Sequence, residues 1–423
     1  MNLLIIGSGA REHAFAWKIY RSKYEVNIYV TNANPGFIGI AKNVILNVND
    51  FDAIKDCILS YNISYVLVGP EIPLINGISD YIKSDSSLSN VFVIGPSKHG
   101  SKLEGSKDFA KSFMKKYNIP TANYMCFNKY TINEGIEYIK NSKPPYVIKA
   151  DGPAAGKGVV IVDNKNEAVH ILNEMLLNLK FGKSSQKVVI EEFLEGIEMS
   201  CFVLFDGLNY KILPYAKDYK RIAEGDTGLN TGGMGSISPV NFLDNDLKNK
   251  IENEIIKPTV NGLIKEKIDY IGFIFIGLIN VKGEPKVIEY NVRMGDPETQ
   301  VVLPRIKNDF LDILVSCVKQ SLDKIDLDLD SNYYANVVLA SGGYPEEYKK
   351  GFEITGLNDI QDSLIFHAGT TINNDKLKTN GGRVLSIVSS SESMKDALNK
   401  SYLNIEKINF KGKVFRKDIG FDL

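Results

Sequence analysis

Polar side chains stand at every second position in the stretch KVIEYNVRMGDPETQ, residues 286–300. Glu289, Asn291 and Arg293 would share one face of a β-strand, because successive side chains of a strand point to opposite sides. A carboxylate and an amide oxygen suit a hard cation such as Mg²⁺, and a guanidinium suits a neighbouring anion. The stretch therefore predicts a strand that binds a metal ion together with phosphate.

A solvent-facing strand would show the same alternation, so the neighbouring sequence matters. The preceding stretch IGFIFIGLINV is strongly apolar and is joined to the polar one by KGEP, which is typical of a turn. Such a pair is expected near the centre of a sheet. Asp296 and Glu298 follow directly after the predicted strand and add carboxylates near the same place.

The glycine-rich stretch KADGPAAGKGVVIV, residues 149–162, also indicates phosphate chemistry. It is not a P-loop, because only three residues separate its first two glycines and Gly158 follows Lys157 where that motif has Ser or Thr. It also leads into a strand instead of a helix. We expect a hairpin loop whose backbone N–H groups cover a triphosphate, with Lys149 as a point charge on the preceding strand.

The N-terminal turn GSGARE, residues 7–12, partly matches the dinucleotide-binding fingerprint. Glu12 stands where the third glycine belongs, and the second strand, IYVTNAN, ends without the acidic residue that would bind a ribose hydroxyl. Both features argue against nicotinamide or flavin binding. The helix N-terminus still suits the phosphate of a small substrate, although a tight turn that needs small residues would explain the pattern equally well.

Composition places the chain among globular proteins of several domains. It has 423 residues, of which 44% are hydrophobic and 24% charged, with a formal net charge of −1. That balance gives no electrostatic reason to bind nucleic acid or an anionic membrane. The N-terminus does not resemble a signal peptide, and the longest apolar stretch is shorter than the roughly 18 residues of a membrane span. Four scattered cysteines, none in a Cys-x-x-Cys pair, indicate reduced thiols and a cytoplasmic protein.

The pattern of elements changes along the chain. Residues 1–103 alternate apolar strands with helical segments, which predicts βαβ units and a parallel sheet. An amphipathic helix then ends before Pro120 and is followed by strands on both sides of the glycine turn. Residues 211–240, rich in Gly, Asp and Thr, predict a long loop. A third region of strands and one helix begins near residue 331, after the linker candidate SLDKIDLDLDSN.

Stretches spread over the whole chain carry a joint signal. They are IIGSGAREHA, VGPEIPL, LEGSKDFAK, VIKADGPAAGKGV, EGDTGLNTGGMGSISP, VIEYNVRMGDPETQ, NGGRV and FRKDIG. Their content and their order resemble the glycinamide ribonucleotide synthetase family of ATP-grasp enzymes. The resemblance implies a multidomain α/β and α+β chain: an N-terminal parallel α/β (Rossmann-like) domain over 1–103, an ATP-grasp domain over 104–328 with a glycine-loop lid subdomain at about 123–190, and a C-terminal α+β domain over 329–423.

The resemblance also implies a reaction of de novo purine biosynthesis. ATP phosphorylates the carboxylate of glycine, and the amine of 5-phosphoribosylamine displaces the phosphate to give glycinamide ribonucleotide, ADP and phosphate. We therefore expect ATP as a substrate, Mg²⁺ or Mn²⁺ as the metal, small molecules as the only partners, and a monomer or weak homodimer.

Each matched residue receives an expected role from this resemblance. The ATP-binding residues are Lys107, Lys149, Gly156, Lys157, Gly158, Glu191, Glu192, Phe193, Leu194 and Glu198. The metal ligands are Glu289 and Asn291, and Arg293 is the catalytic contact with the acyl phosphate or the transferred phosphoryl group. The substrate-binding residues are Gly9, Arg11 and Glu12, facing phosphoribosylamine, and Asp218, Gly232, Gly233, Asp296 and Glu298.

Two departures from the family pattern bear on the predicted site. The strand GFIFIGLIN offers no second metal carboxylate, so metal binding would depend on the two ligands named and on the nucleotide. Pro153 stands where the family usually has Leu, which would stiffen the turn by fixing φ. Two alternatives stay open: another ATP-grasp purine ligase that uses formate or bicarbonate and, from a different class, a nicotinamide oxidoreductase built on GSGARE.

Overall fold

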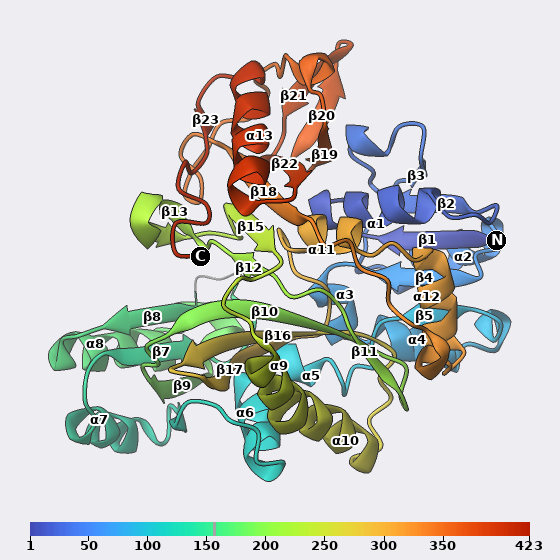
Figure 1. Cartoon of the computed structure of the whole chain (residues 1–423). Coiled ribbons are helices and arrows are strands. Elements are labelled where there is room, and N and C mark those ends of the chain that lie inside the picture. The colour runs from blue at the N-terminus through green and yellow to red at the C-terminus, as the bar shows by residue number, and fades with distance from the viewer. Residues whose placement is uncertain (155–157) are drawn as a thin grey trace.

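The computed structural model describes residues 1–154 and 158–423. Gly156 and Lys157 of the predicted lid loop therefore lie outside the described residues. The N-terminal part is a parallel sheet with strand order β3-β2-β1-β4-β5, coloured in blues in Figure 1. Its elements are β1 (Asn2–Ile6), α1 (Ala10–Tyr20), β2 (Asn27–Thr31), β3 (Lys42–Val44), α2 (Phe51–Ser60), β4 (Tyr65–Val68), α3 (Glu71–Asn76), α4 (Ile78–Ser84) and β5 (Phe92–Ile94).

The central strands of this sheet are apolar along their length. β1 carries LLII and β4 carries YVLV, and all of these side chains are buried. Strands that are covered by helices on both faces have no wet side, so they show continuous apolar runs instead of alternation. The parallel sheet predicted for the N-terminal region is confirmed.

An antiparallel sheet with strand order β6-β9-β7-β8 follows. Two helices pack against it around an apolar cluster that includes Ile148, Leu172 and Val188. β7 and β8 are the two strands of the predicted glycine-turn hairpin. The elements are β6 (Tyr124–Asn128), α7 (Ile132–Asn141), β7 (Tyr146–Ala150), β8 (Val159–Val162), α8 (Lys165–Leu176) and β9 (Lys187–Glu192).

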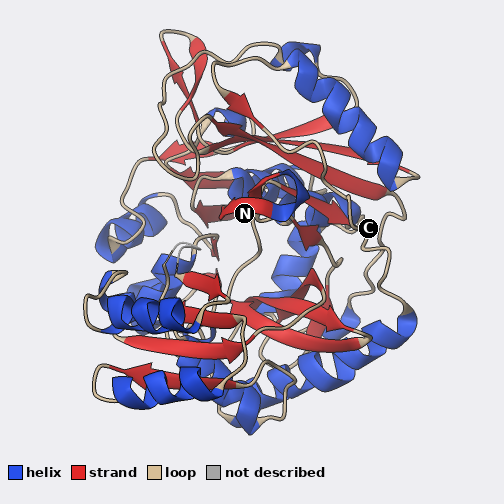
Figure 2. Cartoon of the chain, turned by 90° about the vertical axis from the view of Figure 1, so that its left-hand side faces the viewer, coloured by secondary structure: helices blue, strands red, loops and turns tan. Residues whose placement is uncertain are grey.

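A second antiparallel sheet, β11-β10-β16-β17, carries the polar strand singled out in the sequence. Figure 2 shows these strands in the lower half of the molecule, with helices along its outer side. The strands are β10 (Ile197–Phe205), β11 (Tyr210–Ile212), β16 (Gly272–Val281) and β17 (Glu284–Asn291). The nearby helices are α5 (Lys102–Gly105), α6 (Lys107–Lys116), α9 (Asn245–Lys250), the π-helical turn η5 (Ile251–Ile256), α10 (Lys257–Lys265), α11 (Thr299–Arg305) and α12 (Phe310–Val318).

The two faces of this second sheet have different neighbours. Cys201 and Tyr290 belong to an apolar cluster that includes residues of α9, η5 and α10. Phe202, next to Cys201 on β10, belongs instead to a cluster shared with α1 and α12. Because Glu289 and Asn291 flank Tyr290 on β17, their side chains point away from α9 and α10. Glu289 and Asn291 therefore face the side of the sheet that α9 and α10 do not cover.

The C-terminal part is an antiparallel sheet with α13 packed on it. Its sheet runs β12-β15-β18-β22-β19, and β23 pairs with β18. The elements are β18 (Tyr333–Ser341), β19 (Ser363–His367), β20 (Thr370–Asn373), β21 (Lys376–Thr379), β22 (Arg383–Ser391), α13 (Met394–Lys407) and β23 (Lys413–Val414). Short 3₁₀ turns lie at η1 (Pro35–Phe37), η2 (Ser86–Leu88), η3 (Gly182–Ser185), η4 (Glu224–Asp226), η6 (Leu322–Lys324) and η7 (Leu357–Asp359).

The prediction that residues 211–240 form a loop is wrong in part. The segment contains β11, β12 (Lys217–Asp218), the hairpin of β13 (Arg221–Ala223) and β14 (Thr227–Asn230), and β15 (Gly235–Ser238). β15 pairs along β18, nearly 100 residues later in the chain. This pairing stabilises the short strand GSIS through backbone hydrogen bonds, and local composition cannot reveal such a distant partner. In the described part of the chain, no helix is long and apolar enough to cross a membrane.

The C-terminal tail holds the hairpin of β13 and β14 through Arg416. The Arg416 side chain is fully buried. It donates to both carboxylate oxygens of Asp418 at 2.8 Å and to Asp226 Oδ1, in the turn of the hairpin, at 2.5 Å. The guanidinium also lies 5.3 Å from the ring centroid of Tyr219. A buried charge needs such partners, so the tail and the hairpin depend on each other.

We expect the substitution Arg416→Met to reduce the free energy of unfolding by about 3 kcal/mol, because two carboxylates lose their shared partner. The control is Lys417→Met, which removes the same charge from an exposed neighbouring position and should change stability by less than about 0.5 kcal/mol. Urea unfolding of both variants measures the difference. Equal unfolding midpoints for the two would contradict this account of the tail.

Candidate functional site

The three polar residues predicted to share a strand face lie together at the end of β17. Asn291 Nδ2 donates to Glu289 Oε1 at 3.3 Å, and Arg293 Nη2 donates to Asn291 Oδ1 at 3.1 Å. Gly277 on β16 stands opposite Glu289. A Cβ at Gly277 would lie 3.3 Å from Glu289 Cγ, so the glycine leaves room for the acidic side chain.

The donor atoms on β17 fit a hard divalent cation. A carboxylate and an amide oxygen are ligands that Mg²⁺ prefers, and Mg²⁺ usually takes only one or two ligands from protein and the rest from phosphate and water. Within residues 1–154 and 158–423, no group of three or more His, Cys, Asp or Glu side chains could hold a metal alone. Glu289 and Asn291 are therefore suited to a metal that arrives with a phosphate-bearing substrate.

Two carboxylates from outside β17 contact Arg293. Glu104 Oε1, from α5, lies 2.9 Å from Arg293 Nη2, and Glu71 Oε2, at the start of α3, lies 3.3 Å from Arg293 Nε. Burial works to lower the pKa of Arg293, but these carboxylates raise it, so the guanidinium stays charged. Neither glutamate received a role from the sequence, although VGPEIPL and LEGSKDFAK contain them. Both glutamates lie far from Arg293 in the sequence, so only the folded chain shows that they share this partner.

Three predicted nucleotide contacts, Lys107, Lys149 and Glu191, lie on α6, β7 and β9. A further lysine of α6, Lys111, was not predicted. Lys149 Nζ and Lys111 Nζ lie 2.9 Å and 3.1 Å from the same oxygen, Glu191 Oε2. Burial works to raise the pKa of Glu191, yet the two ammonium groups lower it below its usual value. Lys107, at the start of α6, donates to the carbonyl of Ala150 at 2.9 Å, and burial lowers its pKa.

Glu191 keeps one oxygen free for a further contact. Its Oε1 atom is buried and has no hydrogen-bond partner among the described residues. A buried acceptor without a donor costs free energy, so this position suits a ligand that brings an N–H group. Glu192 accepts from the backbone and side chain of Asn123, while Phe193 is exposed and Leu194 is partly buried in the link between β9 and β10.

A second charged group lies around the start of β10. Lys220 Nζ is 2.8 Å from Glu198 Oε2 and 3.9 Å from Asp218 Oδ1. The Lys220 and Glu198 side chains keep 43% and 46% of their surface exposed, so solvent screens their attraction. The predicted ribose contact and the predicted glycine contact are therefore bridged by a lysine that the sequence did not single out.

Glu298, which follows β17, is a buried acidic residue. Its side chain is 2% exposed, and its Oε1 accepts from Ser200 Oγ at 3.1 Å. Burial and the negative charge of Asp218 raise the pKa of Glu298 to about 8. Burial also raises the pKa of Asp218. Glu298 therefore holds a proton at neutral pH, because burial and the charge of Asp218 both disfavour its ionised form.

The N-terminal turn uses Glu12 for its own structure. Glu12 Oε2 accepts from the backbone N–H of Gly9 at 2.7 Å, and Glu12 Oε1 accepts from Arg11 Nε at 2.7 Å. A Cβ at Gly69 would lie 2.0 Å from Glu12 Oε1, so the carboxylate fills the space beside that glycine. Arg11 Nη1 also donates to the carbonyl of Met294 at 3.2 Å, which ties α1 to the residues that follow β17.

Arg383 joins the predicted glycine loop to the residues after β17. It donates to the carbonyl of Gly232 at 2.7 Å and to the carbonyl of Asp296 at 2.8 Å, and Nη2 lies 2.9 Å from Asp296 Oδ2. Gly233 adopts φ +111° against Pro297, where a Cβ would lie only 2.3 Å from a proline carbon. Asp296 is thus paired within the protein. The sequence stretch NGGRV contained Arg383 without indicating this contact.

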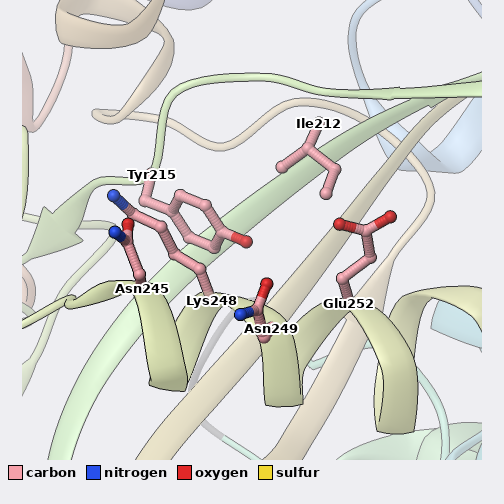
Figure 3. Close-up of a pocket in the computed structure, with 6 residues that line it drawn as sticks. All are labelled: Ile212, Tyr215, Asn245, Lys248, Asn249 and Glu252. Atoms are coloured by element: carbon pink, nitrogen blue, oxygen red, sulfur yellow. The ribbon is translucent and has the colours of Figure 1, made fainter.

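A hollow of about 530 Å³ lies elsewhere in the molecule, between β11 and the helix formed by α9 and η5 (Figure 3). None of the predicted site residues lines it. Its helix belongs to the side of the sheet that faces away from Glu289 and Asn291. The lining residues are Ile212, Tyr215, Asn245, Lys248, Asn249 and Glu252.

Family models match three consecutive parts of the chain. They are described as the phosphoribosylglycinamide synthetase N domain, over residues 1–104, the ATP-grasp (A) domain, over residues 105–299, and the C domain, over residues 334–422. The ATP-grasp match includes Lys107, Lys149 and the polar residues of β17.

Known proteins resemble the chain over its full length. A phosphoribosylamine–glycine ligase of Caldanaerobacter subterraneus is 42% identical over 99% of this chain and 99% of that protein. A bifunctional purine biosynthetic protein, PUR2,5, of Pichia angusta is 43% identical over 99% of this chain, which spans about half (53%) of that longer protein. The crystal structure of a phosphoribosylamine–glycine ligase from Thermotoga maritima superposes with a TM-score of 0.85, at 36% identity, over 99% of this chain and 100% of that one. The chain therefore belongs to the phosphoribosylglycinamide synthetase family, with an ATP-grasp domain at its centre.

Proposed function

We propose that the chain ligates glycine to 5-phosphoribosylamine at the expense of ATP, a step of purine biosynthesis. The observation that carries the proposal is the gathering of Glu289, Asn291 and Arg293 at one strand end, in a chain that matches relatives named for this ligase over its full length. Such a group suits phosphoryl transfer, in which the protein mainly positions the reactants and stabilises charge.

ATP would bind between the lid sheet and the β17 sheet. Lys107 and Lys149 lie at the lid side of this space and carry the positive charge that phosphates need. Gly156, Lys157 and Gly158 would cover the phosphates from the hairpin loop. The free oxygen of Glu191 would accept from the adenine amino group, the backbone of Glu192, Phe193 and Leu194 would read the base edge, and Glu198 would hold the ribose hydroxyls.

Glu289 and Asn291 would hold the divalent metal, which we propose to be Mg²⁺ or Mn²⁺. When bound, it would neutralise charge on the phosphates of ATP. Arg293 would contact the transferred phosphoryl group, because its guanidinium is charged and is held at the same strand end by Glu104. The hairpin loop that we propose to cover the phosphates would also keep water away from the glycyl phosphate.

The two remaining substrates would lie on opposite sides of Arg293. Asp218 and Glu298 would face the ammonium of glycine, under the loop of Gly232 and Gly233. Gly9, Arg11 and Glu12 would line the side of phosphoribosylamine. Asp296 would act through its contacts with Arg383, since both its carboxylate oxygens already have partners.

We also propose the division of the chain into domains at 1–103, 104–328 and 329–423, with the lid at about 123–190. The short strands β12 and β15 come from the middle domain and join the sheet of the last one. A cytoplasmic location is supported by four free cysteines, three of them buried. A monomer or weak homodimer is our proposal for the assembly.

Use of formate or bicarbonate in place of glycine is the nearest alternative activity. The matched N, ATP-grasp and C domain models, all described for phosphoribosylglycinamide synthetase, favour glycine. A nicotinamide oxidoreductase is disfavoured by Glu12, whose carboxylate occupies the turn that a dinucleotide phosphate would need.

The experiment is a measurement of ADP release with Mg²⁺, glycine, and phosphoribosylamine formed in the assay from ribose 5-phosphate and ammonia. We expect release only with all components, and a loss of at least about 100-fold in kcat in Glu289→Gln. The control Glu284→Gln removes the same charge from the exposed start of β17 and should keep wild-type turnover. Release with formate or bicarbonate instead of glycine would discard the proposed substrate, and full activity of Glu289→Gln would discard the proposed metal strand.

The raised pKa of Glu298 predicts a pH dependence of stability. Between its usual pKa of about 4.3 and the folded value of about 8, the folded chain holds a proton that the unfolded chain has released. The stability contributed by this group is therefore present at low pH and is lost as pH rises through about 8. We expect Glu298→Gln to flatten the fall in thermal unfolding midpoint between about pH 5 and 8. Glu284→Gln is the control, and equal slopes for the two variants would show that Glu298 does not hold the proton.

A further inference from the structure

Glu104 holds both the backbone and a side chain of the residues that follow β17. It lies in α5, and its side chain is 10% exposed. One carboxylate oxygen, Oε2, accepts from the backbone N–H of Val292 at 2.8 Å. The other, Oε1, accepts from Arg293 Nη2 at 2.9 Å. A single carboxylate thus directs two successive residues.

Arg293 passes this direction on to the residues of β17. Its Nη2 atom donates to Asn291 Oδ1, and Asn291 Nδ2 donates to Glu289 Oε1. An amide between a guanidinium and a carboxylate has one favourable orientation, because turning it over would place NH₂ against the cation and the carbonyl oxygen against the anion. The placement of Arg293 therefore determines the orientation of Asn291.

Glu71 contacts the same guanidinium without directing it in this way. It approaches Arg293 Nε at 3.3 Å, but Nε makes no hydrogen bond with any described residue. Glu71 also keeps 32% of its side chain exposed. It contributes charge and little geometry, which makes it a matched comparison for Glu104.

We propose that Glu104 is a positioning residue for the metal strand, orienting Asn291 and Glu289 through Arg293 and Val292. This inference rests on the proposed metal site and is independent of which carboxylate the enzyme activates. Groups that orient metal ligands from behind contribute roughly 10- to 100-fold to metal affinity in other proteins. Loss of the Glu104 carboxylate should therefore weaken binding of a metal–nucleotide complex while leaving binding of the nucleotide alone unchanged.

The test uses Glu104→Gln, which keeps the size of the side chain but offers one acceptor oxygen where two are needed. Binding of Mn²⁺ in the presence of ADP is followed by electron paramagnetic resonance of the free ion, and ADP binding is measured separately with EDTA. We expect an affinity for Mn²⁺ with ADP about 10-fold lower than wild type. Glu71→Gln, which removes the same charge beside the same guanidinium, should stay within about twofold.

A second variant guards against a general loss of structure. Glu104→Asp keeps both acceptor oxygens on a side chain one methylene shorter, and its Mn²⁺ affinity should fall between wild type and Glu104→Gln. The proposal is overturned if Glu104→Gln or, should that variant not fold, Glu104→Asp binds Mn²⁺ as tightly as Glu71→Gln does. It is also overturned if wild type shows no ADP-dependent Mn²⁺ binding. Wild type that binds Mn²⁺ with ADP but never turns over glycine would leave this inference standing and discard the proposed substrate.

Discussion

The ion pair between Arg293 and Glu104 joins β17, which carries the proposed metal ligands, to the short helix α5. Both partners are largely buried. Removing two charges from water is costly, and their attraction repays that cost only when further hydrogen bonds complete the geometry. Glu104 meets this condition by accepting from Val292, and Arg293 meets it by donating to Asn291. The pair therefore constrains where β17 and α5 can lie more than it adds to stability. The other contacts of the site are arranged around that fixed strand end.

Segments from every part of the chain reach the residues that follow β17. Glu71 and Arg11 come from helices α3 and α1 of the N-terminal part, and Arg383 comes from β22 of the C-terminal part. Each of these contacts joins a charged side chain of one region to a side chain or backbone carbonyl of another, so none could form within an isolated domain. The short stretch 289–298 thus serves as a common contact for three regions. An enzyme that must bring three substrates together needs such a junction, because misplacement of one reacting group by about 1 Å can cost 100-fold in rate.

The sequence predicted the local features well and the long-range partners poorly. The alternation around Glu289 and Asn291 was sufficient to place both side chains on one strand face, because strand periodicity is a local property. The partners of Arg293 could not be found in this way, since Glu71 and Glu104 lie far from it in the chain. For the same reason, β15 was predicted as loop: its hydrogen bonds come from β18.

Glu12 illustrates a second limit of sequence reasoning. Its position in a phosphate-like turn predicts contact with a substrate, and this stays a prediction. The sequence does not show that its carboxylate also accepts from Gly9 and packs beside Gly69, which follows β4. Glu12 thus stands at the third-glycine position of the fingerprint and binds a backbone N–H of its own turn. Only the packing around a turn distinguishes these two uses of the same backbone N–H groups.

Transfer of oxygen from glycine to phosphate would test the central claim most directly. Glycine carrying oxygen-18 in its carboxylate would be turned over with ATP and phosphoribosylamine, and the inorganic phosphate analysed by mass spectrometry. If the grouped side chains activate the carboxylate of glycine as a glycyl phosphate, one labelled oxygen passes from glycine to the released phosphate. Phosphate without label, formed together with the ligated product, would contradict the account.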